Sequence, residues 1–205
     1  MRLLRCTLLL FLLLSGLLAA ACDRTPKIRP LPANGVILAF GDSLTHGNGA
    51  PAGEAYPDVL AGLLGRTVIN AGVPGEVSAA GRQRLPAQLE QYRPDLVILC
   101  HGGNDFLQRL DRAQTAANLA AMVEQIRAAG ADVVLVGVPE FGLILKPPAF
   151  YREIAERFGI PLEAEIVSDL LGDRDFKSDT IHPNAAGYRR MAEAIHKLIR
   201  DANGV

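Results

Sequence analysis

Two short polar segments near opposite ends of the 205-residue chain hold the side chains best suited to chemistry. The first is Gly41-Asp42-Ser43-Leu44, which follows the apolar run 36–40 and so places Ser43 just past a predicted strand. The second is Asp179-Thr180-Ile181-His182, in which a carboxylate and an imidazole precede a predicted C-terminal helix. Together they supply a hydroxyl nucleophile, a general base and a carboxylate to orient the base, which is the set that acyl transfer through a serine requires.

The elements that must position these groups follow from the hydrophobic pattern. From residue 36 onward, apolar runs of strand length alternate with helical patterns, and the strand runs are continuous, as in strands buried on both faces. This alternation predicts an α/β fold, a three-layer α/β/α sandwich around a parallel sheet of about five strands. The predicted strands are 36–40, 67–70, 96–100, 133–138 and a weaker one near 160–166; the predicted helices are near 54–64, 77–92, 113–129, 148–158 and 184–201.

The polar segments all fall at one rim of this predicted sheet. Ligands of open α/β sheets bind outside the carboxyl ends of the strands. Ser43 follows the first strand, Gly72 the second, and Gly102-Gly103-Asn104-Asp105 the third, while Asp179 and His182 come after the fifth. Each segment alone is a common turn or capping sequence. Their placement, each after a strand and in an order that lets them converge, favours a catalytic site.

Four sequence blocks in this order resemble those of the GDSL, or SGNH, hydrolases: Gly41-Asp42-Ser43-Leu44, Asn70-Ala71-Gly72, Gly102-Gly103-Asn104-Asp105 and Asp179-x-x-His182-Pro183. The resemblance spans about residues 36–201 and is greatest to small bacterial periplasmic esterases of the thioesterase I and arylesterase type. It implies a flavodoxin-like sheet and a serine esterase that cleaves carboxylic esters, acyl thioesters or lysophospholipids through an acyl-serine intermediate. It also implies a monomer whose substrate is a small ester or acyl compound.

The resemblance implies a role for each matched residue. Ser43 is the expected nucleophile, His182 its general base and Asp179 the carboxylate that orients the imidazole. The expected oxyanion hole consists of the backbone N–H groups of Ser43 and Gly72 and the side-chain amide of Asn104. No His, Cys and carboxylate spacing indicates a metal site, so we expect no metal and no cofactor.

Three other side chains could take part in chemistry but have simpler interpretations. His46 is expected on the surface of the helix after Ser43, and Cys100 is expected to be a small core residue. His101, at the end of the third strand, has no assigned role.

The N-terminal 21 residues have the layout of a signal peptide, with Arg2 and Arg5 before an apolar stretch and small residues before Cys22. Small residues directly before a cysteine resemble a bacterial lipobox, which implies lipidation of Cys22 and anchoring of an exported protein on the periplasmic side of a membrane. The alternative is ordinary cleavage and release. Residues 22–34, with three prolines, are predicted to be an extended tether, and 35–205 the hydrolase domain.

Charge argues against a nucleic-acid partner. Without Arg2 and Arg5 the chain carries 19 basic and 22 acidic side chains, a net charge of −3, and it has no dense run of Lys or Arg.

The loop after the fourth strand suggests the nature of the substrate. Four large apolar residues lie there, at the same rim, and we interpret them as an acyl groove, although they could simply pack onto the domain: Phe141, Leu143, Ile144 and Leu145. An O-acetyl esterase acting on cell-wall or other glycans is a second interpretation, weakened by the absence of Trp and the presence of only four Tyr. A catalytically silent, membrane-tethered binding module is a third, and the complete set of candidate residues argues against it.

Overall fold

The computed structural model describes residues 25–140, 142 and 144–205, and a five-stranded parallel sheet lies at its centre. The strand order is β2-β1-β3-β4-β5, all neighbours being parallel. This is the doubly wound, flavodoxin-like order that we predicted. The strands are β1 (Val36–Gly41), β2 (Thr67–Gly72), β3 (Leu96–Cys100), β4 (Asp132–Val136) and β5 (Leu162–Glu163).

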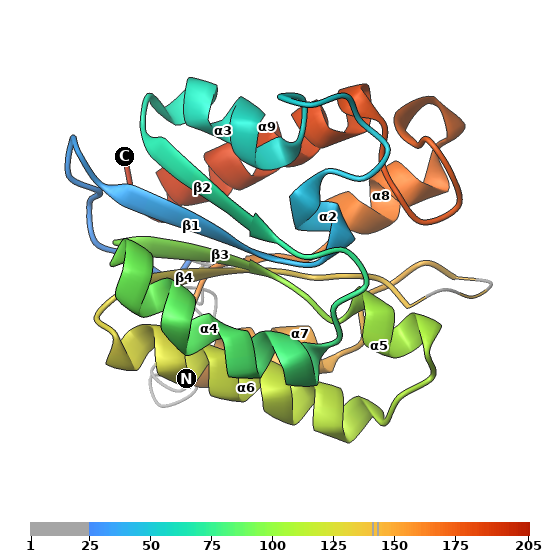
Figure 1. Ribbon diagram of the computed structural model, residues 1–205, viewed down its shortest axis with the longest axis horizontal. Coiled ribbons are helices and arrows are strands. Elements are labelled where there is room, and N and C mark those ends of the chain that lie inside the picture. Colours follow the sequence, from blue (N-terminus) through green and yellow to red (C-terminus); the bar gives the residue numbers. More distant parts are fainter. Residues whose placement is uncertain (1–24, 141, 143) are drawn as a thin grey trace, which may run out of the picture.

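Helices cover both faces of the sheet, which confirms the three-layer sandwich (Figure 1). One face carries α3 (Tyr56–Leu64), α9 (Ala185–Asp201) and the shorter α2 (Ser43–His46) and α8 (Ile166–Gly172). The other face carries α4 (Ser78–Tyr92), α6 (Arg112–Ala128) and α7 (Phe150–Phe158), with α5 (Gly103–Leu107) at the rim. The 3₁₀ turn Arg174–Phe176 packs against α8 and α9.

The sequence of each strand explains how far its side chains are buried. From Ile37 to Phe40 and throughout β3, every side chain is fully buried, as continuous apolar runs predict for central parallel strands. The edge strand β2 is only partly buried, and the other edge strand, β5, is two residues long. The carboxylate of Glu163 ends β5 by accepting the N–H of Ile166 at the start of α8, a short helix that the sequence pattern did not predict.

The chain reverses its winding direction between β1 and β3. After β1 it passes through α3 to β2, and from β2 it crosses back through α4 to β3 on the other side of β1. A crevice opens at such a switch point, outside the carboxyl ends of the two strands. Ser43 directly follows β1 and Asn104 follows β3, so the fold places both beside this crevice.

The segment before β1 differs from the prediction of an extended tether. Ile28 and Leu31 are only 8% exposed and belong to the hydrophobic core. Their N–H groups donate to the carbonyls of Ala202 and Gly204 at the other end of the chain. Residues 25–34 therefore pack onto the domain, because these two apolar side chains gain more from burial than from exposure in a linker.

The predicted signal peptide and Cys22 lie outside the described residues. Within the part of the chain that the structure describes, no helix is both long enough and apolar enough to cross a membrane.

Candidate active site

Ser43, His182 and Asp179 come together at the rim of the sheet. The Oγ atom of Ser43 lies 3.0 Å from Nε2 of His182, and Nδ1 of the same imidazole lies 2.8 Å from Oδ2 of Asp179. Ser43 begins α2 directly after β1, whereas Asp179 and His182 belong to the loop before α9. The fold thus joins, in one hydrogen-bonded series, the three side chains that the sequence singled out.

The loop before α9 also sets the protonation pattern of the imidazole. Oδ1 of Asp179 accepts the backbone N–H groups of Ile181 and His182, both at 2.8 Å, so Oδ2 faces the ring. Burial acts to raise the pKa of Asp179, but the hydrogen bonds from His182 and the two backbone groups outweigh it and lower the pKa. An ionised carboxylate only accepts, so the ring proton is on Nδ1 and Nε2 is free to accept from Ser43.

Asp42 shapes the turn that presents Ser43. Its Oδ1 accepts the N–H of Leu44 at 3.1 Å as the cap of α2, and its side chain is buried. A Cβ at Gly41 would collide with the carbonyl of Cys100, so the chain passes this point only with glycine. Asp42 therefore supports Ser43 from behind by holding the first turn of α2.

Asn104 lies on α5, on the other side of the crevice from Ser43. Its Nδ2 donates to the backbone carbonyl of Glu76 at 3.0 Å and to Oδ2 of Asp42 at 3.3 Å. Gly102, at a φ of 110°, makes the left-handed turn that leads from β3 into α5. The amide of Asn104 is thereby held between the loop after β1 and the loop after β2.

The backbone N–H of Gly72 is already used in a hydrogen bond, although an oxyanion donor was predicted here. This N–H donates to Oδ1 of Asn70 at 3.0 Å. A Cβ there would collide with the backbone of His46, so close packing against α2 explains why this residue is a glycine.

The backbone N–H of Gly75, three residues later, has the property that an oxyanion donor needs, because no described residue accepts it. Gly75 follows Pro74 in a turn closed by the N–H of Glu76, which donates to the carbonyl of Val73 at 3.2 Å. Its φ is 80°, and its amide has no hydrogen-bond acceptor among the described residues. The Pro-Gly dipeptide, which is typical of a type II turn, was the signal that could have identified it.

Comparisons with known proteins agree with this geometry. Residues 39–190 match the GDSL-like Lipase/Acylhydrolase family. The chain belongs to this family. Esterase TesA of Pseudomonas aeruginosa is 31% identical to it over 203 residues, which cover 90% of this chain and 98% of that protein. Thioesterase 1/protease 1/lysophospholipase L1 of Escherichia coli K12 is 31% identical over 199 residues, which cover 93% of this chain and 90% of that protein.

Solved structures are similar to this GDSL-family chain in fold as well. The psychrotrophic esterase EstA from Pseudoalteromonas sp., inhibited by monoethylphosphonate, matches with a TM-score of 0.72 and 26% identity, over 82% of this chain and 97% of that one. A crystal structure of TesA matches with a TM-score of 0.72 and 29% identity, over 82% and 99% of the respective chains.

The cavity at the serine of the GDSL-family site is small, and a larger cavity of about 470 Å³ is lined by Asp179, His182, Asp58 and the loop 46–53. A cavity of about 20 Å³ lies at Ser43 and His182, with Leu107 and Val138 in its wall. Leu145, one of the four predicted groove residues, lines a separate cavity of about 310 Å³ with residues of α7 and α8. Ile144 is 70% exposed, and Phe141 and Leu143 lie outside the described residues.

The remaining candidates have the following settings. His46 is exposed and pairs with Asn48, while Cys100 is fully buried and its pKa is raised by burial, as for an unreactive core thiol. His101, to which the sequence assigned no role, is also fully buried. Within residues 25–140, 142 and 144–205, no group of three or more His, Cys, Asp or Glu side chains could hold a metal ion.

Proposed function

We propose that this chain is a serine esterase that cleaves carboxylic esters through an acyl-serine intermediate, with Ser43 as the nucleophile. The observation that carries the proposal is the series from Asp179 through His182 to Ser43, with distances of 2.8 and 3.0 Å. A hydroxyl, a base with a free nitrogen and an orienting carboxylate are the parts of such a reaction. Family membership and the relatives named as esterases support the same reaction class.

The reaction proceeds in two proton-balanced steps. As Oγ of Ser43 attacks the carbonyl carbon, Nε2 of His182 takes its proton, and Asp179 stabilises the imidazolium. The tetrahedral intermediate then collapses, the ester C–O bond breaks, and His182 returns the proton to the leaving alcohol. Water attacks the acyl-serine in the same way, which releases the carboxylic acid and restores Ser43.

The oxyanion of the intermediate needs donors that point into the crevice. We assign this role to the N–H of Ser43, the N–H of Gly75 and Nδ2 of Asn104, with Gly75 in place of the originally predicted Gly72. Asn104 has two amide hydrogens, and the carbonyl of Glu76 accepts one of them at 3.0 Å. The contact with Oδ2 of Asp42 is longer, at 3.3 Å, so we assign the second hydrogen to the oxyanion. Loss of one such donor typically costs about 10²- to 10³-fold in kcat.

An apolar acyl group suits the surface around this site. Six large hydrophobic side chains are exposed among the described residues, and four of them belong to the loops or helix that follow β2, β3 and β4: Val73, Leu107, Leu110 and Ile144. We therefore propose medium or long acyl chains as the preferred acid part. The Escherichia coli relative is named as a thioesterase and a lysophospholipase, which supports acyl thioesters and lysophospholipids as further substrates to test.

The proposed function is tested by hydrolysis of p-nitrophenyl esters from acetate to palmitate, with Ser43→Ala as the control. Activity that depends on Ser43 and rises with chain length supports both the mechanism and the acyl preference. Activity confined to acetate would contradict the acyl preference, and activity that persists in Ser43→Ala would contradict the mechanism.

We further propose that the protein is exported as a monomer and anchored by lipid at Cys22. The cysteine directly after small residues supports this. The packed segment 25–34 meets the C-terminal residues Ala202 and Gly204, at the end of the sheet away from α2 and α5 (Figure 1). An anchor there would leave the crevice open to substrate. Wild-type protein in the membrane fraction and Cys22→Ser protein in the soluble fraction is the expected result; equal distribution of the two would contradict the anchor.

A further inference from the structure

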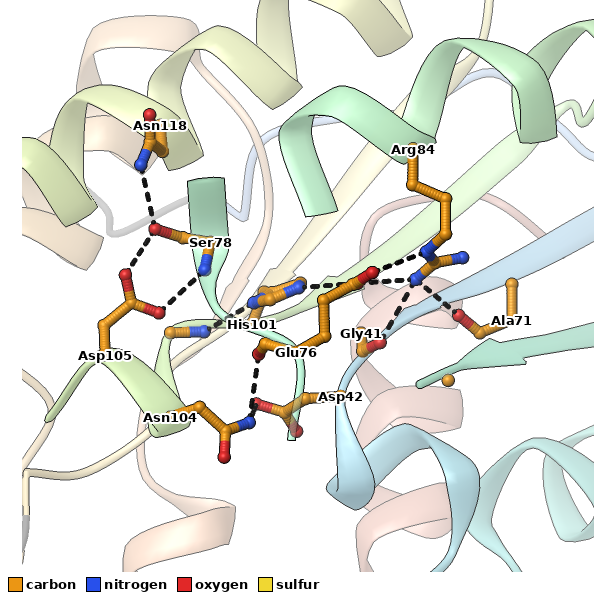
Figure 2. Close-up of polar contacts among 12 residues, drawn as sticks. Gly41, Asp42, Ala71, Glu76, Ser78, Arg84, His101, Asn104, Asp105 and Asn118 are labelled. Atoms are coloured by element: carbon orange, nitrogen blue, oxygen red, sulfur yellow. Dashed lines mark hydrogen bonds and ion pairs between the residues drawn. The ribbon is translucent and has the colours of Figure 1, made fainter. Parts of the chain in front are cut away.

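Three side chains with no role in the proposed reaction form a buried cluster close to Asn104 (Figure 2). They are Glu76 from the loop after β2, Arg84 from α4 and His101 from the end of β3. The side chain of His101 is fully buried, that of Glu76 is 7% exposed, and that of Arg84 is 23% exposed. Charged groups are buried at a cost unless they are paired, so the cluster calls for an explanation.

Arg84 ties the carboxylate of Glu76 to the ends of two strands. Its Nε and Nη2 donate to the two carboxylate oxygens at 2.8 and 2.7 Å, which makes a bidentate ion pair. Nη2 also donates to the carbonyl of Ala71 at 3.1 Å, and the guanidinium lies 4.1 Å above the ring of Phe40. Arg84 therefore holds Glu76 against the ends of β1 and β2, next to the turn that presents Ser43.

His101 holds the same carboxylate from the side of β3. The N–H of Gly102 donates to Nδ1 of His101 at 3.0 Å. A backbone N–H can only donate, so Nδ1 is the acceptor and the ring proton is on Nε2, which donates to Oε2 of Glu76 at 3.1 Å. A Cβ at Gly81 would collide with this Nε2, so helix α4 accommodates the imidazole only with glycine there.

The cluster keeps Glu76 ionised. Burial acts to raise the pKa of Glu76, but the hydrogen bonds from Arg84 and His101 outweigh it and lower the pKa to about 2. The carboxylate is therefore charged at neutral pH, and its charge is balanced by the guanidinium.

The backbone of Glu76 is next to two of the three donors that we assign to the oxyanion, Nδ2 of Asn104 and the N–H of Gly75. Its carbonyl accepts from Nδ2 of Asn104 at 3.0 Å, which aims the second amide hydrogen toward the crevice. Its N–H closes the turn that contains Gly75. Because both oxygens of its carboxylate are held, the side chain restrains the position of this backbone.

We propose that Glu76, held by Arg84 and His101, is the positioning residue for two oxyanion donors, the N–H of Gly75 and the side-chain amide of Asn104. This proposal rests on the proposed serine esterase function. It assigns no proton transfer to the cluster and no contact with substrate. A misplacement of about 1 Å at such donors can lower turnover by about 10²-fold, so the effect of the cluster should be measurable.

The first test is the kinetics of Glu76→Ala on a p-nitrophenyl ester. We expect kcat to fall by about 10- to 100-fold while KM changes little, because the donors act in the transition state. The matched control is Asn118→Ala, since Asn118 is a buried polar residue on α6 that donates to Oγ of Ser78 and has no hydrogen bond to Glu76. We expect this control to lower Tm and leave kcat unchanged. Wild-type kcat in Glu76→Ala would overturn the proposal.

A double variant shows whether Glu76 acts through Asn104. If it does, Glu76→Ala costs less in the Asn104→Ala background than in wild type, because one of the donors it positions is already absent. Equal fold-losses in the two backgrounds would overturn the link to Asn104. If Glu76→Ala fails to fold, Glu76→Gln serves in its place, since it retains one acceptor oxygen and the side-chain volume. A smaller fall in kcat is then expected, and none would contradict the proposal.

A measurement without turnover separates this proposal from the proposed function. The ¹⁵N order parameter of the Gly75 amide should be near the rigid-backbone value of about 0.85 in wild type and lower in Glu76→Ala. If wild type shows no hydrolysis that depends on Ser43, the esterase function fails while a lowered order parameter still supports the positioning role. An unchanged order parameter would overturn that role whatever the activity.

Discussion

Nε2 of His182 lies 3.0 Å from Oγ of Ser43, although the two residues are 139 positions apart in the sequence. One comes from the first turn after β1 and the other from the last loop before α9. The doubly wound sheet brings them to the same rim, because parallel strands present all their carboxyl ends to one side.

Asp179→Asn should disable the base while leaving the loop intact. The side-chain oxygen would stay with the N–H groups of Ile181 and His182, so the new NH₂ would face Nδ1 and force the ring proton onto Nε2. That tautomer cannot accept from Ser43, and kcat should fall by up to about 10⁴-fold.

The control for this variant is Asp58→Asn, an exposed change on α3 in the wall of the cavity of about 470 Å³ that Asp179 and His182 also line, which should leave kcat unchanged. The measurement is steady-state hydrolysis of an ester. If Asp179→Asn retains more than about a tenth of wild-type kcat, Asp179 does not orient the base in the way we describe.

Gly75→Ala should lower kcat by shifting the amide that we assign to the oxyanion. An alanine is strained at a φ of 80°, by about 1 kcal/mol or more, and the turn will relax. Gly130→Ala is a matched control, since Gly130 has a φ of 85°, open space around its Cβ position and a place at the far end of α6. Both variants should lose similar stability by thermal unfolding, but only Gly75→Ala should lose activity. Equal kcat values would exclude Gly75 as a donor.

Leu107→Ser should reduce the preference for long acyl chains. Leu107 is 44% exposed and lines the cavity at Ser43, whereas Leu63, 40% exposed, lies at the far end of α3 and provides the control. Each CH₂ transferred from water to apolar surroundings contributes about 0.8 kcal/mol, so a weakened apolar surface flattens the dependence of kcat/KM on chain length. Identical chain-length profiles for Leu107→Ser and Leu63→Ser would contradict an acyl surface at this rim.

Acid should remove the contribution of Glu76 to stability. Its pKa is lowered from 4.5 to about 2 in the folded protein, so its ionised form favours folding. That contribution is fully present above pH 4.5 and is lost as the pH falls toward 2. Unfolding by urea should show a difference between wild type and Glu76→Gln that shrinks over this range. A difference that stays constant would show that the carboxylate is not held in its ionised form.

The sequence was sufficient to predict the sheet and the three side chains that the structure joins in one hydrogen-bonded series. Continuous apolar runs such as 36–40 have few alternatives to buried strands, and Ser43, Asp179 and His182 are recognisable because each follows a strand or precedes a helix. Gly72 illustrates the limit. Asn70-Ala71-Gly72 resembles a family block, but the side chain of Asn70 accepts the N–H of Gly72. The Pro74-Gly75 dipeptide indicates a turn, and the structure adds that the N–H of Gly75 has no acceptor among the described residues.

Tertiary contacts account for what the pattern missed. Ile28 and Leu31 stand among prolines and charges, and their burial depends on residues at the other end of the chain. Glu76 and His101 are 25 residues apart and come from different elements, so no local spacing indicates that they meet. Buried polar clusters of this kind are specified by the packing of several elements together.

The most direct test of the central claim is to trap the covalent intermediate. The protein is mixed with p-nitrophenyl butyrate, quenched in acid within the first turnover, digested and analysed by mass spectrometry. We predict one butyryl group on the peptide that contains Ser43, released p-nitrophenol in equal amount, and neither signal in Ser43→Ala. A butyryl group on another residue, or turnover by Ser43→Ala at the wild-type rate, would contradict the assignment of Ser43 as the nucleophile.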